Sequence, residues 1–438
     1  MGNFAIEKAT AILIESVVLQ SPSNPIQVDI KNVVSDIDIF EHIDKPYVSA
    51  VLSFTDGDNI VSALNISGAE TVDIVLKANT VVAVPVEIQF YIDKVITAAK
   101  GNETNELVAL HLTQTVNYRS NLQNVNKAYS GKPTTIMAKI ASEFLDTTIK
   151  ASTEPPQKMK LIVPNLTPLN AMSWIKNKIS TEKGYPFYLY SYLGGEELFL
   201  VDLKTMLEKP AINEGAPYTF TESAIPSPDE NFDDTSRRRI IMDYQVKDTD
   251  NLYSLIDRGL IGATHQFIDV TNNEVVNHKH NMIDVTDTLV EDDLIKKNPL
   301  FSLYFEDNGT PYGEIQSRHI SQIASTQAFE GFDSYNQSET VGQYKLNSTQ
   351  QAMVGLIRKQ PLSIIVNGID FLQIEGNSTI GNKLEVMFPA NLNDEGKSSD
   401  RFDKKKSGNY LIYSAKHSIS RDAYTIALTC VKISNGDV

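Results

Sequence analysis

Hydrophobic and polar residues alternate one by one along much of this chain, which is the pattern of β-strands that bury one face. The clearest early runs are Ile26–Ile30, Val33–Phe40 and Tyr47–Phe54, and turn-forming residues such as Thr55–Asp58 separate them. Strands continue to about Val116. Six or more short strands with regular turns predict a small barrel or sandwich in residues 1–118.

The strand pattern near the start of the chain returns at its end. Phe90–Val116 and Tyr410–Ile433 each read as a strand, a short polar turn and a second strand rich in Val, Leu, Ile and Thr. The preceding segments, Ile66–Leu76 and Ile380–Phe388, also correspond, since a glycine precedes a short alternating strand in both. The repetition predicts two copies of one β-module in one polypeptide.

Residues 119–236 change to a helical period and then to a Pro-rich linker. Pro133 is well placed in the first turn of a helix, and Thr167–Pro168 begins a second helix with Leu169, Met172, Ile175 and Ile179 as its apolar stripe. An aromatic hairpin, Tyr185–Asp202, turns at two consecutive glycines. These signals predict a small α/β domain.

The second β-module is expected to be discontinuous, built from 237–286 plus 361–438, with a helical insertion at 287–360 between the two parts. Two helices, Tyr312–Phe329 and Ser348–Arg358, are expected in the insertion. The expected strands of the module are Ile240–Val246, Gly259–Val270, Glu274–Val276 and those within Pro361–Ile433. The whole chain is therefore predicted to be α+β and mostly β.

Charge narrows the possible partners. The 438 residues hold 55 Asp and Glu against 39 Lys and Arg, a net charge of -16. This balance argues against a protein that grips nucleic acid, which needs clustered cations. Arg237, Arg238 and Arg239 form the one compact basic run. They are the candidate subunit interface, where they would pair with an acidic patch on a partner; the alternative is a solvated start to the next strand.

Cysteine content and hydropathy indicate in which cellular compartment the protein is made and used. Cys430 is the only cysteine, so no intramolecular disulfide can form, and its alternating surroundings predict a small buried side chain. No apolar run reaches the length of a membrane span, and Glu7 and Glu15 interrupt the apolar N-terminal stretch. We expect a protein made and used in a cytoplasm, without stable membrane insertion.

No motif carries convincing chemistry. Ser130–Thr134 lacks the first glycine and the Ser/Thr of a phosphate-binding loop, so a helix entry explains it. His278 and His280 would share one face of a strand, but no third ligand is visible and a polar turn is the simpler interpretation. Asn391–Gly396 has the wrong spacing for a calcium loop. We expect no catalytic, metal or cofactor site, and hence no enzyme.

The order of these domains resembles a known family. A β-module, a small α/β domain, an insertion and a closing module that ends in Gly408–Val431 look like the baseplate hub proteins of contractile-tailed phages. That family includes the T-even central hub subunit, the late control protein D group and the N-terminal part of type VI secretion spike proteins, the VgrG group. The segment Leu166–Leu203 also fits this resemblance.

The resemblance implies a structural role in a virion. Three copies, each with two tube-type β-barrel modules, would form a pseudo-hexameric ring that joins a hexameric tail tube to a trimeric central spike. The expected partners are the spike protein, the tail tube or a tube initiator, and also a tape measure protein and the baseplate wedge. DNA would pass through the lumen during ejection without specific binding, which suits an acidic chain. The protein would be assembled in the host cytoplasm.

Three other functions are weighed against the hub. The chain could serve a type VI secretion system or a related contractile injection machine, which shares the fold. A peptidoglycan hydrolase would need a catalytic constellation that does not stand out. A carbohydrate-binding tail-tip protein could stack sugars on Tyr185, Phe187, Tyr188, Tyr190 and Tyr192, although aromatic residues that alternate on a strand usually pack a core.

Overall fold

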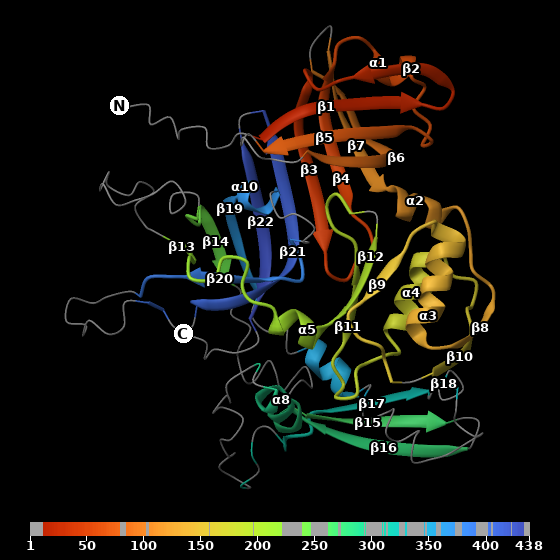
Figure 1. The fold of residues 1–438 in the computed structure, drawn as a ribbon, viewed down its shortest axis with the longest axis vertical. Helices are drawn as coiled ribbons and strands as arrows, with labels where there is room; N and C mark the ends of the chain where they lie inside the picture. The colour runs from red at the N-terminus through yellow and green to blue at the C-terminus, as the bar shows by residue number, and fades with distance from the viewer. Residues whose placement is uncertain are drawn as a thin grey trace.

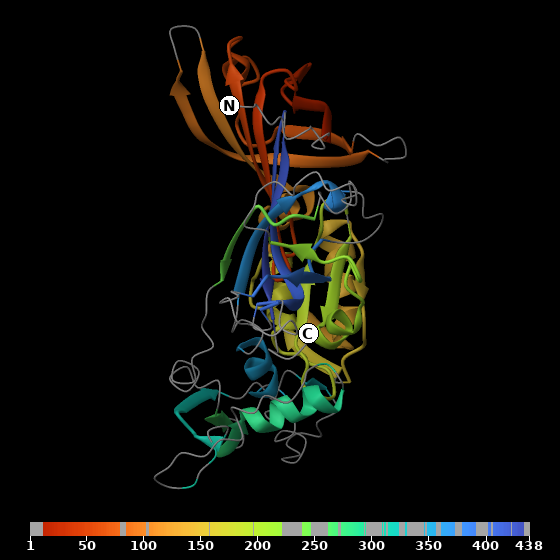
Figure 2. The ribbon, with the colours of Figure 1, turned by 90° about the vertical axis from the view of Figure 1, so that its left-hand side faces the viewer.

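The computed structural model describes most of the chain. The described residues are 12–78, 85–101, 105–156, 158–195, 197–220, 239–246, 262–269, 273–292, 294, 309, 311, 314–323, 329–330, 346, 348–355, 361–372, 379–390, 402–403, 406–421 and 423–432. Within them, no helix is long and apolar enough to cross a bilayer. The molecule is elongated, with the first β-module at one end and a small sheet and a helix from within residues 262–323 at the other (Figures 1 and 2).

One large sheet, mostly antiparallel, runs through both β-modules. Its strands follow the order β14-β19-β22-β21-β3-β4-β7-β6-β5-β1-β2, with β20 pairing β21 and β13 pairing β20. The first module supplies β1 (Ile12–Ser21), β2 (Asn24–Asp29), β3 (Val34–His42), β4 (Ser49–Asp56), the short helix α1 (Ile60–Ala63), β5 (Thr71–Ala78), β6 (Val86–Lys100) and β7 (Glu106–Gln114). The second supplies β13 (Tyr218–Thr219), β14 (Asp243–Val246), β19 (Pro361–Asn367), α10 (Ile369–Leu372), β20 (Lys383–Met387), β21 (Gly408–Ser420) and β22 (Tyr424–Val431).

The two modules repeat the same six elements in the same order. In the first, β3, β4, α1, β5, β6 and β7 follow one another, with pairings β3·β4, β4·β7, β7·β6 and β6·β5. In the second, β14, β19, α10, β20, β21 and β22 do the same, with pairings β14·β19, β19·β22, β22·β21 and β21·β20. The similarity predicted from the repeated hairpins therefore extends to the strand order of both modules.

The repeat holds at the level of single residues. The β6·β7 ladder shifts register after Ile92, which pairs with Leu112, and the β21·β22 ladder shifts after Ile412, which pairs with Cys430. Ile92 and Ile412 are thus equivalent. Cys430 is fully buried, as predicted, and burial raises the pKa of its thiol.

Alternation accounts for the core of each module. In β4 every second residue, from Ala50 to Phe54, is buried. Its partner β7 buries Val108, Leu110 and Leu112 in the same way. Each fully buried aliphatic side chain removes enough apolar surface from water to stabilise the fold by about 1.5–3 kcal/mol. The mostly β fold predicted from sequence is confirmed, while closed tube-type barrels stay a prediction.

The α/β domain lies beside the second module (Figures 1 and 2). Two small sheets lie here, with the strand orders β18-β10-β8 and β11-β12-β9. Of these strands, β18 (Phe329–Glu330) comes from the later segment between β14 and β19. Pro133 and Pro168 occupy the first positions of α3 and α4, as predicted, and the four residues of the predicted apolar stripe are buried. The elements are α2 (Thr115–Asn121), β8 (Ala128–Gly131), α3 (Pro133–Ile140), the π-helical turn η1 (Ala141–Leu145), β9 (Ile149–Ala151), β10 (Lys158–Ile162), α4 (Pro168–Lys176), β11 (Phe187–Tyr190), β12 (Leu198–Asp202) and α5 (Leu203–Glu208).

The segment between β14 and β19 forms a sheet of its own. Its described elements are β15 (Gly262–Asp269), β16 (Glu274–Asn281), α8 (Met282–Glu291), β17 (Arg318–Ile323), β18 (Phe329–Glu330) and a helix over 348–355. β15 pairs with β16 and with β17. The sequence predicted that β15 and β16 belong to the second β-module, but neither strand joins the large sheet. The domain boundaries themselves stay a prediction.

The two helices expected in this segment have different outcomes. The second is confirmed over 348–355. The first, expected over Tyr312–Phe329, is wrong where β17 stands, because residues 318–323 pair in parallel with β15. The spacing of Ile315, Ile320 and Ile323 suggested a helical face, but pairing with a neighbouring strand outweighs a weak local propensity.

Candidate assembly interface

The two β-modules meet edge to edge, strand against strand. β21 pairs antiparallel with β3, in a register that runs from Ser414 opposite His42 to Ser420 opposite Asp36. The longest strand of the second module thus continues the sheet of the first (Figure 1). Both strands alternate, and the inward residues of β21, Ala415, His417 and Ile419, are buried.

A buried polar trio lies across this junction. His417 on β21 contacts Glu41 on β3 through Nε2, at 2.8 Å from Oε2, and Tyr424 on β22 through Nδ1, at 2.8 Å from the hydroxyl. The side chains of Glu41 and His417 are completely buried. The second carboxylate oxygen of Glu41 accepts the backbone N–H of Leu193 at 2.7 Å. Three parts of the chain, both β-modules and the α/β domain, therefore converge on one carboxylate.

Tyr424 owes its place to a glycine. A Cβ atom added to Gly368 would stand 2.5 Å from the Tyr424 ring, closer than any side chain tolerates. The backbone N–H of Gly368 also donates to the carbonyl of Tyr424 at 3.1 Å. Burial, with the nearby carboxylate of Glu41 as a second cause, raises the pKa of Tyr424, so its hydroxyl stays protonated.

The solvent side of the junction carries weaker polar contacts. Lys416 Nζ lies 3.0 Å from a carboxylate oxygen of Asp38, and the Ser418 hydroxyl donates to the other oxygen of that group at 2.7 Å. Lys416 also lies over the ring of Phe40, 5.7 Å from its centroid. Half-exposed pairs of this kind are worth about 0.5 kcal/mol each, so they fix register more than they add stability.

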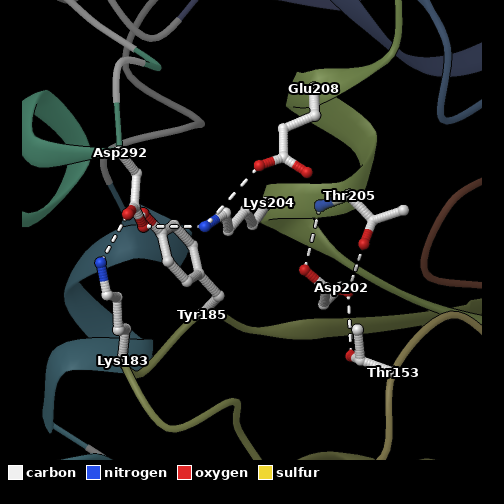
Figure 3. A network of polar contacts seen from close by, with 8 residues as sticks. All are labelled: Thr153, Lys183, Tyr185, Asp202, Lys204, Thr205, Glu208 and Asp292. Atoms are coloured by element: carbon white, nitrogen blue, oxygen red, sulfur yellow. Dashed lines mark hydrogen bonds and ion pairs between the residues drawn. The ribbon is translucent and has the colours of Figure 1, made fainter.

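A second polar network ties the segment between β14 and β19 to the α/β domain (Figure 3). Asp292, just after α8, accepts the hydroxyl of Tyr185 at 2.8 Å and pairs with Lys183 and Lys204. Burial would raise the pKa of Asp292, but the hydrogen bonds from Lys183 and Tyr185 hold it below its usual value. The carboxylate thus stays charged and anchors the end of α8 to Lys183 and Tyr185, just before β11.

Asp202 is likewise the centre of a hydrogen-bond network, in this case within the α/β domain (Figure 3). It caps α5 by accepting the backbone N–H of Thr205 at 3.0 Å, and it accepts the hydroxyls of Ser152, Thr153 and Thr205. Burial opposes its charge, but these hydrogen bonds outweigh burial and lower its pKa. The network is fully satisfied and holds the residues after β9 against α5.

The predicted basic run is only partly described. Arg237 and Arg238 lie outside the described residues. Arg239 points inward: its guanidinium donates to the carbonyl of Ala216 at 3.2 Å and lies 3.7 Å from a carboxylate oxygen of Asp370. The subunit interface assigned to the three arginines stays a prediction.

The histidine pair does not lie in the polar turn expected from sequence. His278 and His280 both belong to β16, and β15 places His265 opposite His278. Burial first, and His265 and His278 next, lower the pKa of His280 to about 4. Among the described residues, no group of three or more His, Cys, Asp or Glu side chains is arranged to hold a metal ion.

The aromatic hairpin packs inward. Tyr185, Phe187, Tyr188 and Tyr190 are each at most 2 % exposed. Buried rings cannot stack on a sugar, so these four residues offer no carbohydrate platform. The three tyrosines belong to a core that the hairpin shares with the second module, and Phe187 belongs to the core of the α/β domain.

Sequence reasoning missed the trio at the junction, which is the most deeply buried polar cluster between the two modules in the described chain. His417 belongs to no recognisable sequence motif. Its position was the available signal, because Ala415, His417 and Ile419 follow one another at the strand period on an apolar face. A histidine at such a position needs a polar partner, which a single sequence does not name.

Comparisons with known proteins agree on the fold. No protein-family profile matches the chain, and no curated protein sequence matches it. A tail protein from Neisseria meningitidis superposes with a TM-score of 0.56 at 14 % identity, over 95 % of this chain and 96 % of that one. The 43 kDa tail protein of prophage MuSo2 from Shewanella oneidensis gives 0.51 at 11 % identity, over 97 % and 100 %.

A component of the E. coli type VI secretion system is less similar, with a TM-score of 0.43 at 11 % identity over 98 % of this chain and 78 % of that one. The resemblance stated from sequence is thus met by structural similarity to phage tail proteins over almost the whole length of the chain. The chain therefore has the fold of these phage tail proteins.

Proposed function

We propose that this chain is the hub subunit of a phage tail baseplate, and that three copies form a ring of six similar β-modules. The ring would join a hexameric tail tube to a trimeric central spike. One observation carries the proposal: the chain contains the same six-element module twice, joined edge to edge through β3 and β21. Two equivalent modules in each of three chains give a ring six similar faces.

The fold shared with phage tail proteins supports a structural role in a tail. The net charge of -16 suits a ring through which DNA passes, because a lining rich in carboxylates does not retain phosphates. The buried trio supports the same role. A hub transmits load between tube and spike, and a junction with a satisfied buried network holds its two modules in one orientation.

The test is the mass of the full-length protein in solution, measured by light scattering with and without its candidate spike protein. We expect a particle near three times 48.6 kDa, either alone or once the spike is added. Class averages by electron microscopy should then display six similar densities around a hole. A protein that remains a monomer with spike and tube proteins present would contradict the proposal.

The same experiment separates the phage hub from a component of a contractile injection machine. The hub should form a stable complex with the tail tube or tube-initiator protein from the same virus. A chain that binds only a type VI secretion tube would belong to the other class of machine.

A further inference from the structure

We infer that the outer half of β6, from Asp93 to Lys100, takes β14 of a neighbouring copy as an antiparallel strand. This inference rests on the proposed ring and specifies how its subunits join. The partner is a second copy of this chain, and the contact repeats between chains what β21 and β3 do within one chain.

The two equivalent long strands, β21 and β6, differ in the number of strands that pair along one side. β21 has two partners along one side: β20 pairs with Gly408–Leu411 and β3 pairs with Ser414–Ser420. β6 has the equivalent of the first partner only, since β5 pairs with Val86–Tyr91. Beyond Tyr91, no strand in the described part of the chain pairs with that side of β6.

The second step is the matching edge. β3 lies between β4 and β21, whereas its equivalent β14 pairs with β19 alone among the described strands. The second module therefore presents, in β14, an unpaired strand equivalent to the one that would complete the outer half of β6. Within one chain these two edges cannot meet, because β19, β22, β21, β3, β4 and β7 lie between them in the sheet. At about 4.8 Å a strand, that is roughly 30 Å of sheet.

The third step is the exposure of apolar side chains on the free stretch. Val95 is 38 % exposed, Ile96 is 48 % exposed, and Leu107 on the adjacent β7 is 52 % exposed. Proteins normally protect an open strand edge by shortening, charging or covering it. Here β6 is the longest strand described, and it projects together with its partner β7 beyond the other strands of the first module (Figure 2). An arriving strand would cover it.

The equivalence of the modules also gives the register. Ser418 pairs with Asp38 across the existing junction. Ser418 faces Thr425 on β22, and the equivalent residue of the first module, Ala99, faces Leu107 on β7. Asp38 faces Val51 on β4, and its equivalent Gln245 faces Ser363 on β19.

Ala99 of one copy should therefore stand opposite Gln245 of the next, with Lys100 opposite Tyr244. Such a head-to-tail contact uses two different surfaces of each chain. It closes into a ring when three copies complete the turn.

The test is site-specific cross-linking in the full-length protein, together with its spike if the trimer needs it. Ala99→Cys and Gln245→Cys are combined in one chain, and both positions are exposed, so folding should be unaffected. The native Cys430 is buried and stays inert. Directly opposite strand residues bring their Cβ atoms within about 5.5 Å, close enough for a disulfide on mild oxidation.

We expect covalent trimers on a non-reducing gel from the double variant. Neither single variant should give trimers. A matched control combines Gln245→Cys with Gln27→Cys, which lies exposed on β2 at the opposite end of the sheet. This control should remain uncross-linked.

The outcomes separate the two claims. A trimer by mass in which Ala99→Cys and Gln245→Cys do not cross-link, or in which the control pair cross-links equally well, overturns the strand pairing and leaves the hub proposal standing. A protein that never forms a trimer, with or without the spike, overturns both.

Discussion

The two β-modules share one plan and differ in what connects their first two strands. In the first module β3 leads to β4 through residues 43–48, whereas in the second the same connection, from β14 to β19, spans residues 247–360 and carries the small sheet and α8. The pairing of β14 with β19 survives this interruption, as β3·β4 does without one. The strand order of the module therefore tolerates a large insertion, and here Asp292 anchors that insertion to the α/β domain.

Replacing the buried His417 should cause the largest loss of stability, because this residue joins the two β-modules. In His417→Ala, Glu41 keeps the backbone N–H of Leu193 but loses its side-chain partner in a site without solvent, which should lower the free energy of unfolding by about 3 kcal/mol. Urea unfolding of the full chain measures the loss. Ser418→Ala, one residue along the same strand, is the control and should cost about 1 kcal/mol or less. Equal losses in the two variants would mean that the trio contributes little.

Truncating equivalent core leucines tests whether the two modules are equally well packed. Leu110 and Leu428 occupy the same position in the repeat, and both are at most 1 % exposed. Each change to alanine should cost about 2–5 kcal/mol, because a cavity remains where the side chain was removed. We expect the two losses, measured by urea unfolding, to agree within about 1 kcal/mol. A much smaller loss at one site would show that the modules are alike in topology but not in packing.

Acidification should destabilise the sheet formed by β15, β16 and β17 more than either β-module. The pKa of His280 is lowered to about 4, against about 6.5 for an unfolded chain, so the folded sheet binds fewer protons between these values. Its contribution to stability is present above pH 6.5 and is lost as the pH falls toward 4, by about 3 kcal/mol at most.

Amide hydrogen exchange, corrected for its intrinsic pH dependence, should then show β15 and β16 losing protection over that interval while β4 and β7 keep theirs. His280→Leu should flatten the response. His319→Leu, at an exposed position of β17, should leave it unchanged. Equal loss of protection across all these strands would point to global unfolding instead.

The smallest effect is expected at the solvent side of the module junction. Lys416→Ala removes a pair with Asp38 in which both side chains are partly exposed, so it should cost about 0.5 kcal/mol. Raising the salt concentration to 1 M should erase most of the difference from the parent protein, since the charges are screened. A cost above 2 kcal/mol would mean that Lys416 also supports the packing of Phe40.

How far the sequence reaches can be judged from particular elements. Alternation identified β3 and β4 and the repeated hairpin, because a half-buried strand fixes its own pattern. Prolines marked the first turns of α3 and α4 for a local reason, the fixed φ of proline at a helix start. In contrast, the sequence predicts a helix where β17 stands, since the pairing of β17 with β15 is a contact that no local window contains.

The candidate interface was hidden for the same reason. Glu41 and His417 are 376 positions apart, and only the pairing of β3 with β21 brings them together. The basic run Arg237–Arg239 stood out in composition, but the described part of it, Arg239, is engaged within its own chain. Residue types in the sequence pointed to candidate interface residues, but only the strand pairing shows which of them meet.

The edge of β3 has a consequence for synthesis on the ribosome. The first module has been made long before its outer strand β3 finds a partner, because β21 begins only at Gly408, far along the chain from His42 at the end of β3. Until then an alternating strand with a fully formed core behind it remains open to whatever edge it meets first. The order of translation thus makes the C-terminal hairpin the step that protects the nascent N-terminal half from sticking to its neighbours. A chain truncated before Gly408 should therefore aggregate even though its first module is complete in sequence.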